Sequence, residues 1–323
     1  MDKILGRAHQ CLDETGWTHW APRAFLGAGA NSIAVLLVSV KTNKEAVLLM
    51  ERHDKAQLPL GSPTVLAYMN SGVYIRDHFS GMGIPVPETI EAPKLWSGGA
   101  ALIMSRIPGR DINEILIKGG VINPGPVARK VAEIIQTGWE IEKVDPSHST
   151  GWGKHLFGQS APFSNGADVF ADYLSPIMNI ADQDAVRLAH QVQHIASVQL
   201  LSTPRATCLW DVSERNLMLC ENGNLVGVVD QVDLWSGDPM FIPGTAMAML
   251  ADVNMWPGVD EYEDSWRRSW GCSSQEWQRV SLHRLGTFGR WIGRRAKNPE
   301  KTIRNKVERW KQQALEMIST YSP

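Results

Sequence analysis

The amino-acid sequence predicts an α+β protein of two lobes. The N-terminal lobe is expected to hold an antiparallel sheet and one main helix, and the C-terminal lobe to be mostly helical with one β-hairpin. The apolar runs 34–40 and 46–50, joined by a short polar turn, are typical of paired strands. Beyond residue 110 the apolar residues recur mostly at helical spacing. The exception is a pair of short apolar runs on either side of Asn222-Gly223.

Length and composition restrict the class of protein. The chain has 323 residues, enough for two modest domains. Its formal net charge of -2 gives no indication of a nucleic-acid or membrane partner. Residues 1–10 lack the apolar segment of a secretory signal, and runs such as 33–40 are too short to span a bilayer. The four cysteines are Cys11, Cys208, Cys220 and Cys272, and they form no CxxC pair. Their scattered positions favour free thiols in a reducing compartment over a disulfide framework. We therefore expect a cytoplasmic protein.

Breaks in the pattern place the lobe boundary after residue 105. A helix is expected over 63–79, where glycines and prolines then end it, and a buried strand over 100–105. Ile107-Pro108-Gly109 interrupts the chain directly after that strand. The expected domains are 1–105 and 106–323. In the second we expect several helices from 244 onward and three before it: 126–142, 167–180 and 183–201.

The hairpin carries the candidate chemistry. Asn-Gly between the runs 217–220 and 225–229 predicts a tight primed turn, with positive φ at both central residues. Folding there places Asn216, just before the first strand, nearly opposite Asp230, just after the second. Asp211 stands five residues ahead of Asn216.

These three residues suit one kind of chemistry. Two oxygen donors are typical of magnesium sites, because the ion keeps several waters. A third carboxylate can accept a hydroxyl proton during phosphoryl transfer. Taken singly, Asp211 could be a helix N-cap, Asn216 a turn residue and Asp230 a solvated acid, but their joint placement favours a site.

The segment from Trp210 to Asp230, followed by Gly237-Asp238-Pro239, resembles the catalytic core of the aminoglycoside phosphotransferase and choline kinase family. The resemblance implies a protein kinase-like fold, with 1–105 as the nucleotide-binding lobe and 106–323 as the catalytic and acceptor-binding lobe. It also implies Asp211 as the catalytic base and Asn216 and Asp230 as ligands of Mg²⁺, with ATP or GTP as co-substrate.

Two weaker matches give the nucleotide site that the resemblance implies. The glycine-containing segment 25–33 resembles the loop that covers the nucleotide, since glycines let backbone amides approach phosphate. The segment 101–109 is similar to the family's linker between lobes, which presents backbone groups to adenine. The implied nucleotide-binding residues are Gly27, Ala28, Gly29, Asn31, Ser32, Ser105, Arg106 and Ile107.

The sequence also departs from the family pattern. Leu209 stands two residues before Asp211, where the family usually has a His. The segment 241–244 replaces an Asp that often follows Gly-Asp-Pro. The run 46–50 contains no lysine to hold the phosphates, and the helix that follows lacks the partner glutamate. Arg52 is our first candidate for the missing cation and Lys55 the second. Alternatively, Glu51 and Arg76 form an ion pair in which the charges of the family's strand lysine and helix glutamate are exchanged.

The predicted reaction is transfer of the γ-phosphoryl group to a hydroxyl of a small molecule, such as a sugar, an amino sugar or antibiotic, an amino alcohol or a nucleoside-like acceptor. The alternatives are a catalytically silent member that binds nucleotide or a partner, and a nucleotidyl transferase. The acceptor's charge stays open. The acidic run 260–264 suits a cation, whereas the basic stretch 284–311 suits a phosphorylated acceptor, and either can be a solvated face.

Overall fold

The fold is described from a computed structural model. It covers residues 2–29, 32–52, 63–139, 154–155, 165–179, 182–201, 203, 206–209, 211–213, 215–230, 234–252, 256–298 and 300–319. The contacts divide the chain into two compact units. Unit 1 comprises Met1–Pro108 and Val226–Asp233, and unit 2 comprises Gly109–Leu225 and Leu234–Pro323. The boundary between the units after Pro108 falls within Ile107-Pro108-Gly109, where the strand pattern of the sequence ends. The grouping of Val226–Asp233 with the N-terminal part was not predicted.

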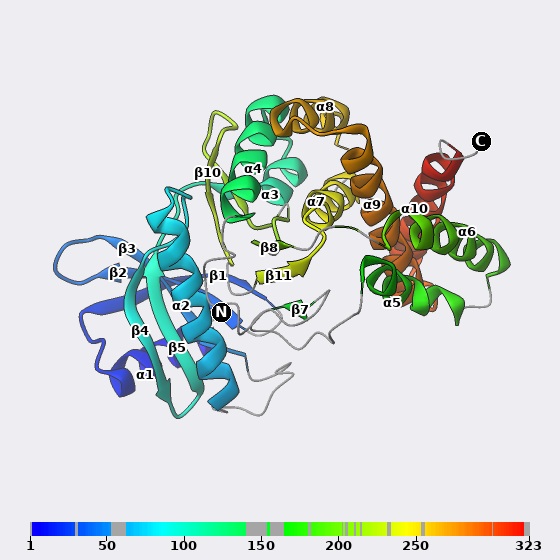
Figure 1. Ribbon diagram of the computed structural model, residues 1–323. Helices are drawn as coiled ribbons and strands as arrows, with labels where there is room; N and C mark the ends of the chain where they lie inside the picture. The colour runs from blue at the N-terminus through cyan, green and yellow to red at the C-terminus, as the bar shows by residue number, and fades with distance from the viewer. Residues whose placement is uncertain are drawn as a thin grey trace. The chain divides into compact units, whose positions relative to one another are not determined.

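Unit 1 is built on a five-stranded sheet of order β1-β2-β3-β5-β4, in which the neighbouring strands are antiparallel (Figure 1). The expected N-terminal sheet with one main helix is therefore confirmed. A second helix, α1, was not predicted. The elements are α1 (Asp2–Thr15), β1 (Trp20–Ala28), β2 (Ser32–Ser39), β3 (Glu45–Glu51), α2 (Pro63–Gly81), β4 (Thr89–Trp96) and β5 (Gly99–Ser105).

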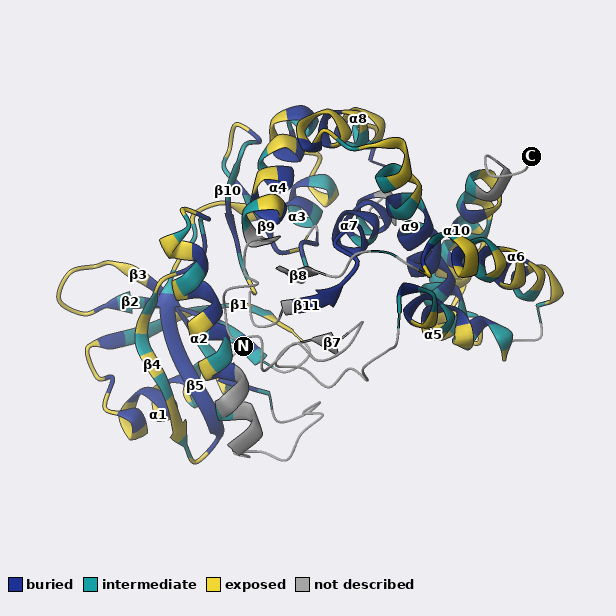
Figure 2. Ribbon diagram, in the orientation of Figure 1, coloured by how far each residue is buried: buried dark blue, intermediate teal, exposed yellow. Residues whose placement is uncertain are grey.

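Residues 46–50 of β3 and 99–104 of β5 are all apolar because both faces of the sheet are covered. Alternate residues such as Leu48 and Ile103 join Leu12 of α1 in one core cluster. The residues between them, such as Val47 and Leu102, join a second cluster that contains Met69 of α2. Figure 2 shows β5 buried along most of its length. The apolar character of β3, which removes the family's lysine, thus follows from burial on two sides.

Unit 2 is mainly helical, as expected. Its elements are β6 (Arg110–Asp111), α3 (Ile112–Ile117), α4 (Pro124–Trp139), β7 (Lys154–His155), α5 (Gly166–Met178), α6 (Gln183–Gln199), β8 (Ala206–Leu209), β9 (Leu217–Leu219), β11 (Leu234–Gly237), α7 (Phe241–Asp252), α8 (Val259–Trp270), α9 (Ser274–Arg295) and α10 (Lys301–Ser319). Residues of α5, α6, α9 and α10 form one large core. In the described part of the chain, no helix has the length and apolarity to cross a membrane.

Two small three-stranded sheets accompany these helices. Their orders are β10-β9-β6, with β10 over Leu225–Val228, and β7-β11-β8. The hairpin of β9 and β10 was predicted. The two-residue strands β6 and β7 were not, because pairing this short leaves no periodic signal in sequence.

The turn between β9 and β10 differs from the expected primed turn. Gly223 has a φ of 77°, but Asn222 is not among the described non-glycine residues with positive φ. The N–H of Gly223 donates to the carbonyl of Cys220 at 2.9 Å, and the N–H of Cys220 donates to that of Asn224 at 3.0 Å. This pattern is a turn closed by one left-handed glycine, the other common hairpin loop. The expected primed turn is therefore wrong, although the hairpin is present.

Substitution of Gly223 by alanine should destabilise unit 2 by about 1–3 kcal/mol. Its φ of 77° disfavours any Cβ, and a Cβ there would lie 2.9 Å from the carbonyl oxygen of Val121. The matched control is Gly119→Ala, which has a φ of 70° and no atom within 4 Å of the added Cβ. Chemical denaturation should show a larger loss of unfolding free energy for Gly223→Ala. Equal losses would mean that the contact with Val121 is unimportant.

Candidate active site

Asp211, the predicted base, and Asp230, a predicted metal ligand, share an uncommon backbone conformation. Three described residues other than glycine have a positive φ: Asn43 at 60°, Asp211 at 58° and Asp230 at 63°. Asn43 lies in the turn between β2 and β3. Asp211 and Asp230 each stand two residues beyond the end of a strand, β8 and β10 respectively. Aspartate tolerates this region better than most residues, yet the conformation costs on the order of 1 kcal/mol. Strain of this kind concentrates at functional sites.

Asn216 is linked directly to Asp211. Its side-chain Nδ2 donates to the backbone carbonyl of Asp211 at 2.9 Å, and the residue is only 7% exposed. The bond fixes the side-chain amide and leaves its oxygen as the atom that can face a cation. Asp211 is half-buried. Asp211 and Asn216 are therefore brought together in unit 2, as the sequence predicts.

Asp230 is exposed and belongs to unit 1. The strand ahead of it is fastened within that unit, because the N–H of Val228 donates to the carbonyl of Pro85 at 2.8 Å. Gly227 packs closely there as well. A Cβ on Gly227 would lie 2.6 Å from Cγ2 of Ile107 and 3.1 Å from the oxygen of Pro85. The expected approach of Asp230 to Asn216 stays a prediction.

The predicted nucleotide loop joins β1 to β2. Gly27 and Ala28 end β1, Ser32 begins β2, and the N–H of Gly29 donates to the carbonyl of Ser32 at 2.9 Å. Asn31 lies outside the described residues. Gly27 has no positive φ, and a Cβ there would meet no atom within 4 Å. The fold itself therefore does not require glycine at Gly27, which fits a loop that a ligand approaches closely.

Arg52, our first candidate for the missing phosphate-binding cation, contacts this loop. Its Nη1 donates to the carbonyl oxygen of Gly29 at 2.8 Å. Strand β3 ends at Glu51, so the cation follows it directly. Lys55, the second candidate, lies outside the described residues.

The expected adenine-binding segment begins at the end of β5. The N–H of Ser105 donates to the carbonyl of Glu88 at 2.7 Å, and its hydroxyl accepts from the N–H of Glu88 at 2.8 Å. The side chain of Arg106 forms an ion pair with Glu45. Ile107 packs near Gly227. Because the Ser105 N–H is engaged, Arg106 and Ile107 are the better candidates to offer backbone groups to a base.

Asp238 anchors the loop after β11 through contacts that the sequence did not reveal. Asp238 is 1% exposed, and its Oδ2 lies 2.9 Å from Nε2 of His283 and 3.2 Å from Nε of Arg279. Its Oδ1 accepts the N–H of Met240 at 3.0 Å. Both partners come from α9, so Asp238 ties the loop to that helix. Breaking a buried charge network of this kind is strongly destabilising.

Ring stacking strengthens the same loop. Phe241, which begins the segment that replaces the family's second Asp, stacks on Trp235 with ring centroids 4.2 Å apart. Its ring also meets His283 edge-on at 5.4 Å. These aromatic contacts replace the expected polar anchor. No local sequence signal links Asp238 with a helix some forty residues later.

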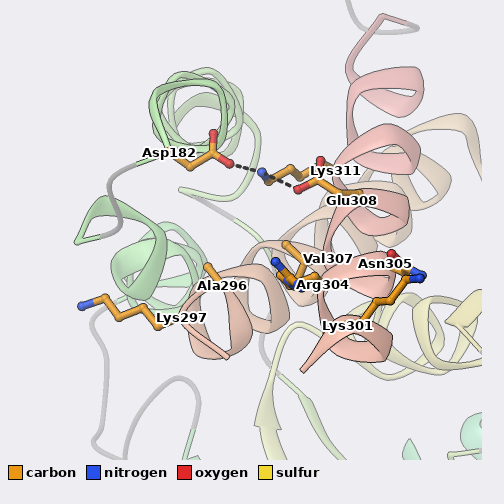
Figure 3. A pocket seen from close by; sticks show the side chains of 9 residues that line it. All are labelled: Asp182, Ala296, Lys297, Lys301, Arg304, Asn305, Val307, Glu308 and Lys311. Carbon is orange, nitrogen blue, oxygen red and sulfur yellow. Dashed lines mark hydrogen bonds and ion pairs between the residues drawn. The ribbon is translucent and has the colours of Figure 1, made fainter. Parts of the chain in front are cut away.

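A cavity of about 560 Å³ lies between the N-cap of α6, the C-terminal end of α9 and helix α10, within unit 2 (Figure 3). Lys311 points across it, and its Nζ pairs with Asp182, the N-cap of α6, and with Glu308 at 3.1 Å. Burial lowers the pKa of Lys311. The ion pair with Asp182 fastens α10 to the start of α6. None of the predicted site residues lines the cavity, whose lining residues are Asp182, Ala296, Lys297, Lys301, Arg304, Asn305, Val307, Glu308 and Lys311.

The donor set determines which metal the predicted site would suit. Within the described part of the chain, no group of three or more His, Cys, Asp or Glu is arranged to hold a metal ion. Such groups are typical of zinc and other transition metals. One amide oxygen of Asn216 and one carboxylate of Asp230 instead fit Mg²⁺, which keeps most of its waters.

The chain has the kinase-like fold of the antibiotic phosphotransferases. The GDP complex of wild-type aminoglycoside 2'-phosphotransferase-IIIa superposes with a TM-score of 0.68 at 11% identity, over 98% of this chain and 99% of that one. A ternary complex of aminoglycoside phosphotransferase APH(4)-Ia with ADP and hygromycin B gives 0.66 at 14% identity, over 97% and 99%. Macrolide 2'-phosphotransferase type I gives 0.60 at 10% identity, over 95% and 96%. No protein-family model and no curated protein sequence matches the chain. At these identities the likeness establishes the fold, which confirms the fold that the sequence resemblance predicted.

Proposed function

We propose that the protein is a phosphotransferase that moves the γ-phosphoryl group of ATP or GTP to a hydroxyl of a small molecule. The observation that carries the proposal is the left-handed backbone at both Asp211 and Asp230, within a fold shared with antibiotic phosphotransferases. Strain at two separate acids is difficult to explain by stability alone. The GDP and ADP in the solved neighbours support a nucleotide co-substrate.

In this proposal each residue has one role. Asp211 orients the acceptor hydroxyl and accepts its proton as the oxygen attacks the γ-phosphorus and the nucleoside diphosphate leaves. Asn216 and Asp230 would hold Mg²⁺, which when bound neutralises charge on the phosphates. Arg52 and the backbone of the loop at Gly27 would hold the phosphates.

The silent-binder alternative is less well supported. A protein that only binds nucleotide needs a metal site and a loop, but it needs no base. Asp211 nevertheless keeps the strained conformation, and Asn216 bonds to its carbonyl oxygen. The absence of a basic residue from β3 favours the binder. The contact of Arg52 with Gly29 weakens that argument, because it places a candidate for the missing cation at the predicted nucleotide loop.

The acceptor is proposed only as a class. The neighbours act on aminoglycosides and macrolides by their names, which supports a small hydroxylated acceptor for this chain. The acidic start of α8 would favour a cationic acceptor, and the basic stretch 284–311 an anionic one. A cytoplasmic location likewise stays a prediction.

Phosphorus NMR of reaction mixtures tests the proposal. The protein is incubated with Mg²⁺ and either ATP or GTP, together with pools of sugars, aminoglycosides, macrolides, amino alcohols and nucleosides. We expect signals of a nucleoside diphosphate and a phosphomonoester with at least one pool. Pyrophosphate and a phosphodiester would indicate a nucleotidyl transferase. Nucleotide binding without any product would support the silent binder.

A further inference from the structure

The five arginines of helix α9 differ in how their charges are compensated. The first two form ion pairs with acids of the loop after β11 and of helix α8. Arg295 lies over the ring of Trp310, with its guanidinium carbon 5.8 Å from the ring centroid. Neither Arg290 nor Arg294 forms an ion pair within the described part of the chain. These two residues are four apart and share one face of the helix, where like charges are destabilising, so the pair does not serve the stability of α9.

Arg290 is held over a buried aromatic ring. Its guanidinium carbon lies 4.8 Å from the ring centroid of Tyr173, a buried residue of helix α5, and Arg290 itself is half-buried. A guanidinium in this position gains a cation–π interaction. Its N–H donors point outward in its own plane, so they stay able to bind an oxyanion. The side chain is therefore oriented before any ligand binds.

Close packing of α9 on α5 fixes the backbone that carries both arginines (Figure 1). A Cβ on Gly289 would lie 3.0 Å from Cδ1 of Ile177, and a Cβ on Gly293 would lie 2.6 Å from that of Pro176. Each of these glycines directly precedes one of the two arginines, so larger residues there would push the helices apart. Binding groups on packed helices are positioned more precisely than binding groups on loops.

The two arginines are close enough to act on each other. Burial lowers the pKa of Arg294, and the positive charge of Arg290 lowers it further. Both groups nevertheless stay charged at neutral pH, because arginine is effectively always protonated. The charge of Asp172 also acts on Arg294, but this acid is exposed and forms no ion pair with it in the described structure. A bound oxyanion would relieve the repulsion between the two guanidinium groups.

A series of contacts within unit 2 connects this pair with the predicted base. Strand β8 ends two residues before Asp211 and pairs with β11, which contains Trp235. Trp235 stacks on Phe241 with ring centroids 4.2 Å apart, and the Phe241 ring lies 5.2 Å from that of Tyr173. The ring of Tyr173 then meets the first of the two arginines. The pair therefore belongs to the same part of unit 2 as the strand that leads to the base.

The acidic run 260–264 gives weaker support to a cationic acceptor. Glu263 is partly buried and pairs with Arg284, so its charge is already compensated. The other acids of the run are exposed: Asp260, Glu261 and Asp264. Acids in the first turn of a helix are stabilised by the helix dipole, so the run needs no ligand to explain it.

We propose that Arg290 and Arg294 form a binding site for an oxyanion, a phosphate or a carboxylate, on the acceptor. The acceptor is then a hydroxylated small molecule with a negative charge, of the class of sugar phosphates and hydroxy acids. The proposal rests on the proposed function, because it names the class of acceptor whose hydroxyl Asp211 would deprotonate. Guanidinium groups hold phosphate and carboxylate by paired N–H···O bonds, a geometry that an ammonium group does not offer.

Steady-state kinetics with matched acceptors tests the charge preference. The hexose set is glucose, glucose 6-phosphate, gluconate and glucosamine, and the glycerol set is glycerol, glycerol 3-phosphate, glycerate and serinol. Any acceptor found by phosphorus NMR is added with its charged and uncharged derivatives. We expect an anionic form to exceed its neutral parent at least about 10-fold in kcat/KM, as charge-assisted hydrogen bonds allow. The better anion distinguishes phosphate from carboxylate, and a preference for the neutral or cationic form would overturn the proposal.

Substitutions on α9 locate the preference. Arg290→Met and Arg294→Met should each raise the KM for the anionic acceptor about 10–100-fold, while the KM values for its neutral parent and for MgATP stay unchanged. Arg290→Lys should recover part of the loss, because it keeps the charge but not the paired donors. The matched control is Arg295→Met, which makes the same change one residue later, over Trp310, and should have no effect. Wild-type KM values in both methionine variants, or equal changes for the anionic and neutral acceptors, would contradict the site.

Titration calorimetry gives a readout that needs no turnover. The anionic members of the panel are titrated into wild type, Arg290→Met and Arg290→Lys. Wild type should bind at least one of them, with a Kd about 10–100-fold lower than that of Arg290→Met. Thermal unfolding of each variant accompanies the titrations, because Arg290→Met also loses the cation–π interaction with Tyr173, which Arg290→Lys can keep. Failure of every anionic member to bind would overturn the proposal.

The outcomes separate this proposal from the proposed function. A protein that binds an anionic member through Arg290 but forms no phosphomonoester contradicts the function and leaves the oxyanion site in place. A protein that phosphorylates a neutral or cationic acceptor, with kinetics that Arg290→Met does not change, contradicts the oxyanion site alone. A protein that neither binds an anionic member nor transfers phosphate contradicts both.

Discussion

Replacement of Asp211 by asparagine is expected to lower phosphoryl transfer by about 10²–10⁴-fold, while the affinity for MgATP stays nearly unchanged. A base contributes to the transition state much more than to nucleotide binding. Asparagine keeps the size of the side chain and tolerates the left-handed backbone at φ 58°, so the loop should keep its shape. Turnover with an identified acceptor and calorimetry of MgATP binding measure the two quantities.

The matched control is Asp184→Asn, which makes the same chemical change in the exposed first turn of α6. It should leave both turnover and affinity at wild-type values. If Asp211→Asn also keeps wild-type turnover, Asp211 is not the base. If it loses MgATP affinity as strongly as turnover, its role is in binding.

Asp230→Asn should reduce both MgATP affinity and turnover. The carboxylate is expected to hold the metal that joins protein to phosphate, and an amide is a weaker ligand for Mg²⁺. We expect a rise of at least about 10-fold in the Kd for MgATP, with the Kd for ATP in EDTA unchanged. Asparagine again suits the left-handed backbone, here at φ 63°. A variant with normal MgATP affinity would show that Asp230 is not a metal ligand.

Much of the fold could be predicted because burial leaves a direct trace in the sequence. Strands β3 and β5 are apolar on both faces, and helix α2 follows with clear ends. Helix α1 was not predicted although its sequence carries the signal of a helix. Leu5, Ala8 and Leu12 recur at helical spacing and pack in one cluster with the sheet. The turn type was wrong because Asn-Gly fixes the left-handed glycine but not the conformation of the residue before it.

The candidate site divides in the same way between local and distant information. The order and spacing of Asp211, Asn216 and Asp230 are local, so a linear motif reveals them. Their backbone strain is not visible in the sequence. The contact of Arg52 with Gly29 joins residues 23 positions apart, just beyond the ends of β3 and β1. The sequence suggested Arg52 as a replacement for the lysine but did not indicate its contact with Gly29.

Contacts between segments far apart in the sequence could not be predicted at all. Asp238 meets His283 of α9 across 45 residues, and Lys311 of α10 pairs with Asp182 across 129 residues. Neither pair has a repeating pattern or a motif that would connect its members. The sequence showed that a lysine was missing from β3, and only the fold showed that α2 carries a buried arginine, Arg76.

A crystal structure with Mg²⁺ and a non-hydrolysable ATP analogue tests the central claim most directly, namely that Asp211, Asn216 and Asp230 serve one site. The account predicts a magnesium ion bound by Oδ1 of Asn216 and the carboxylate of Asp230 at about 2.0–2.1 Å. The carboxylate of Asp211 should face the γ-phosphate without binding the metal. A metal held by other residues, or Asn216 and Asp230 on separate surfaces, would contradict the account.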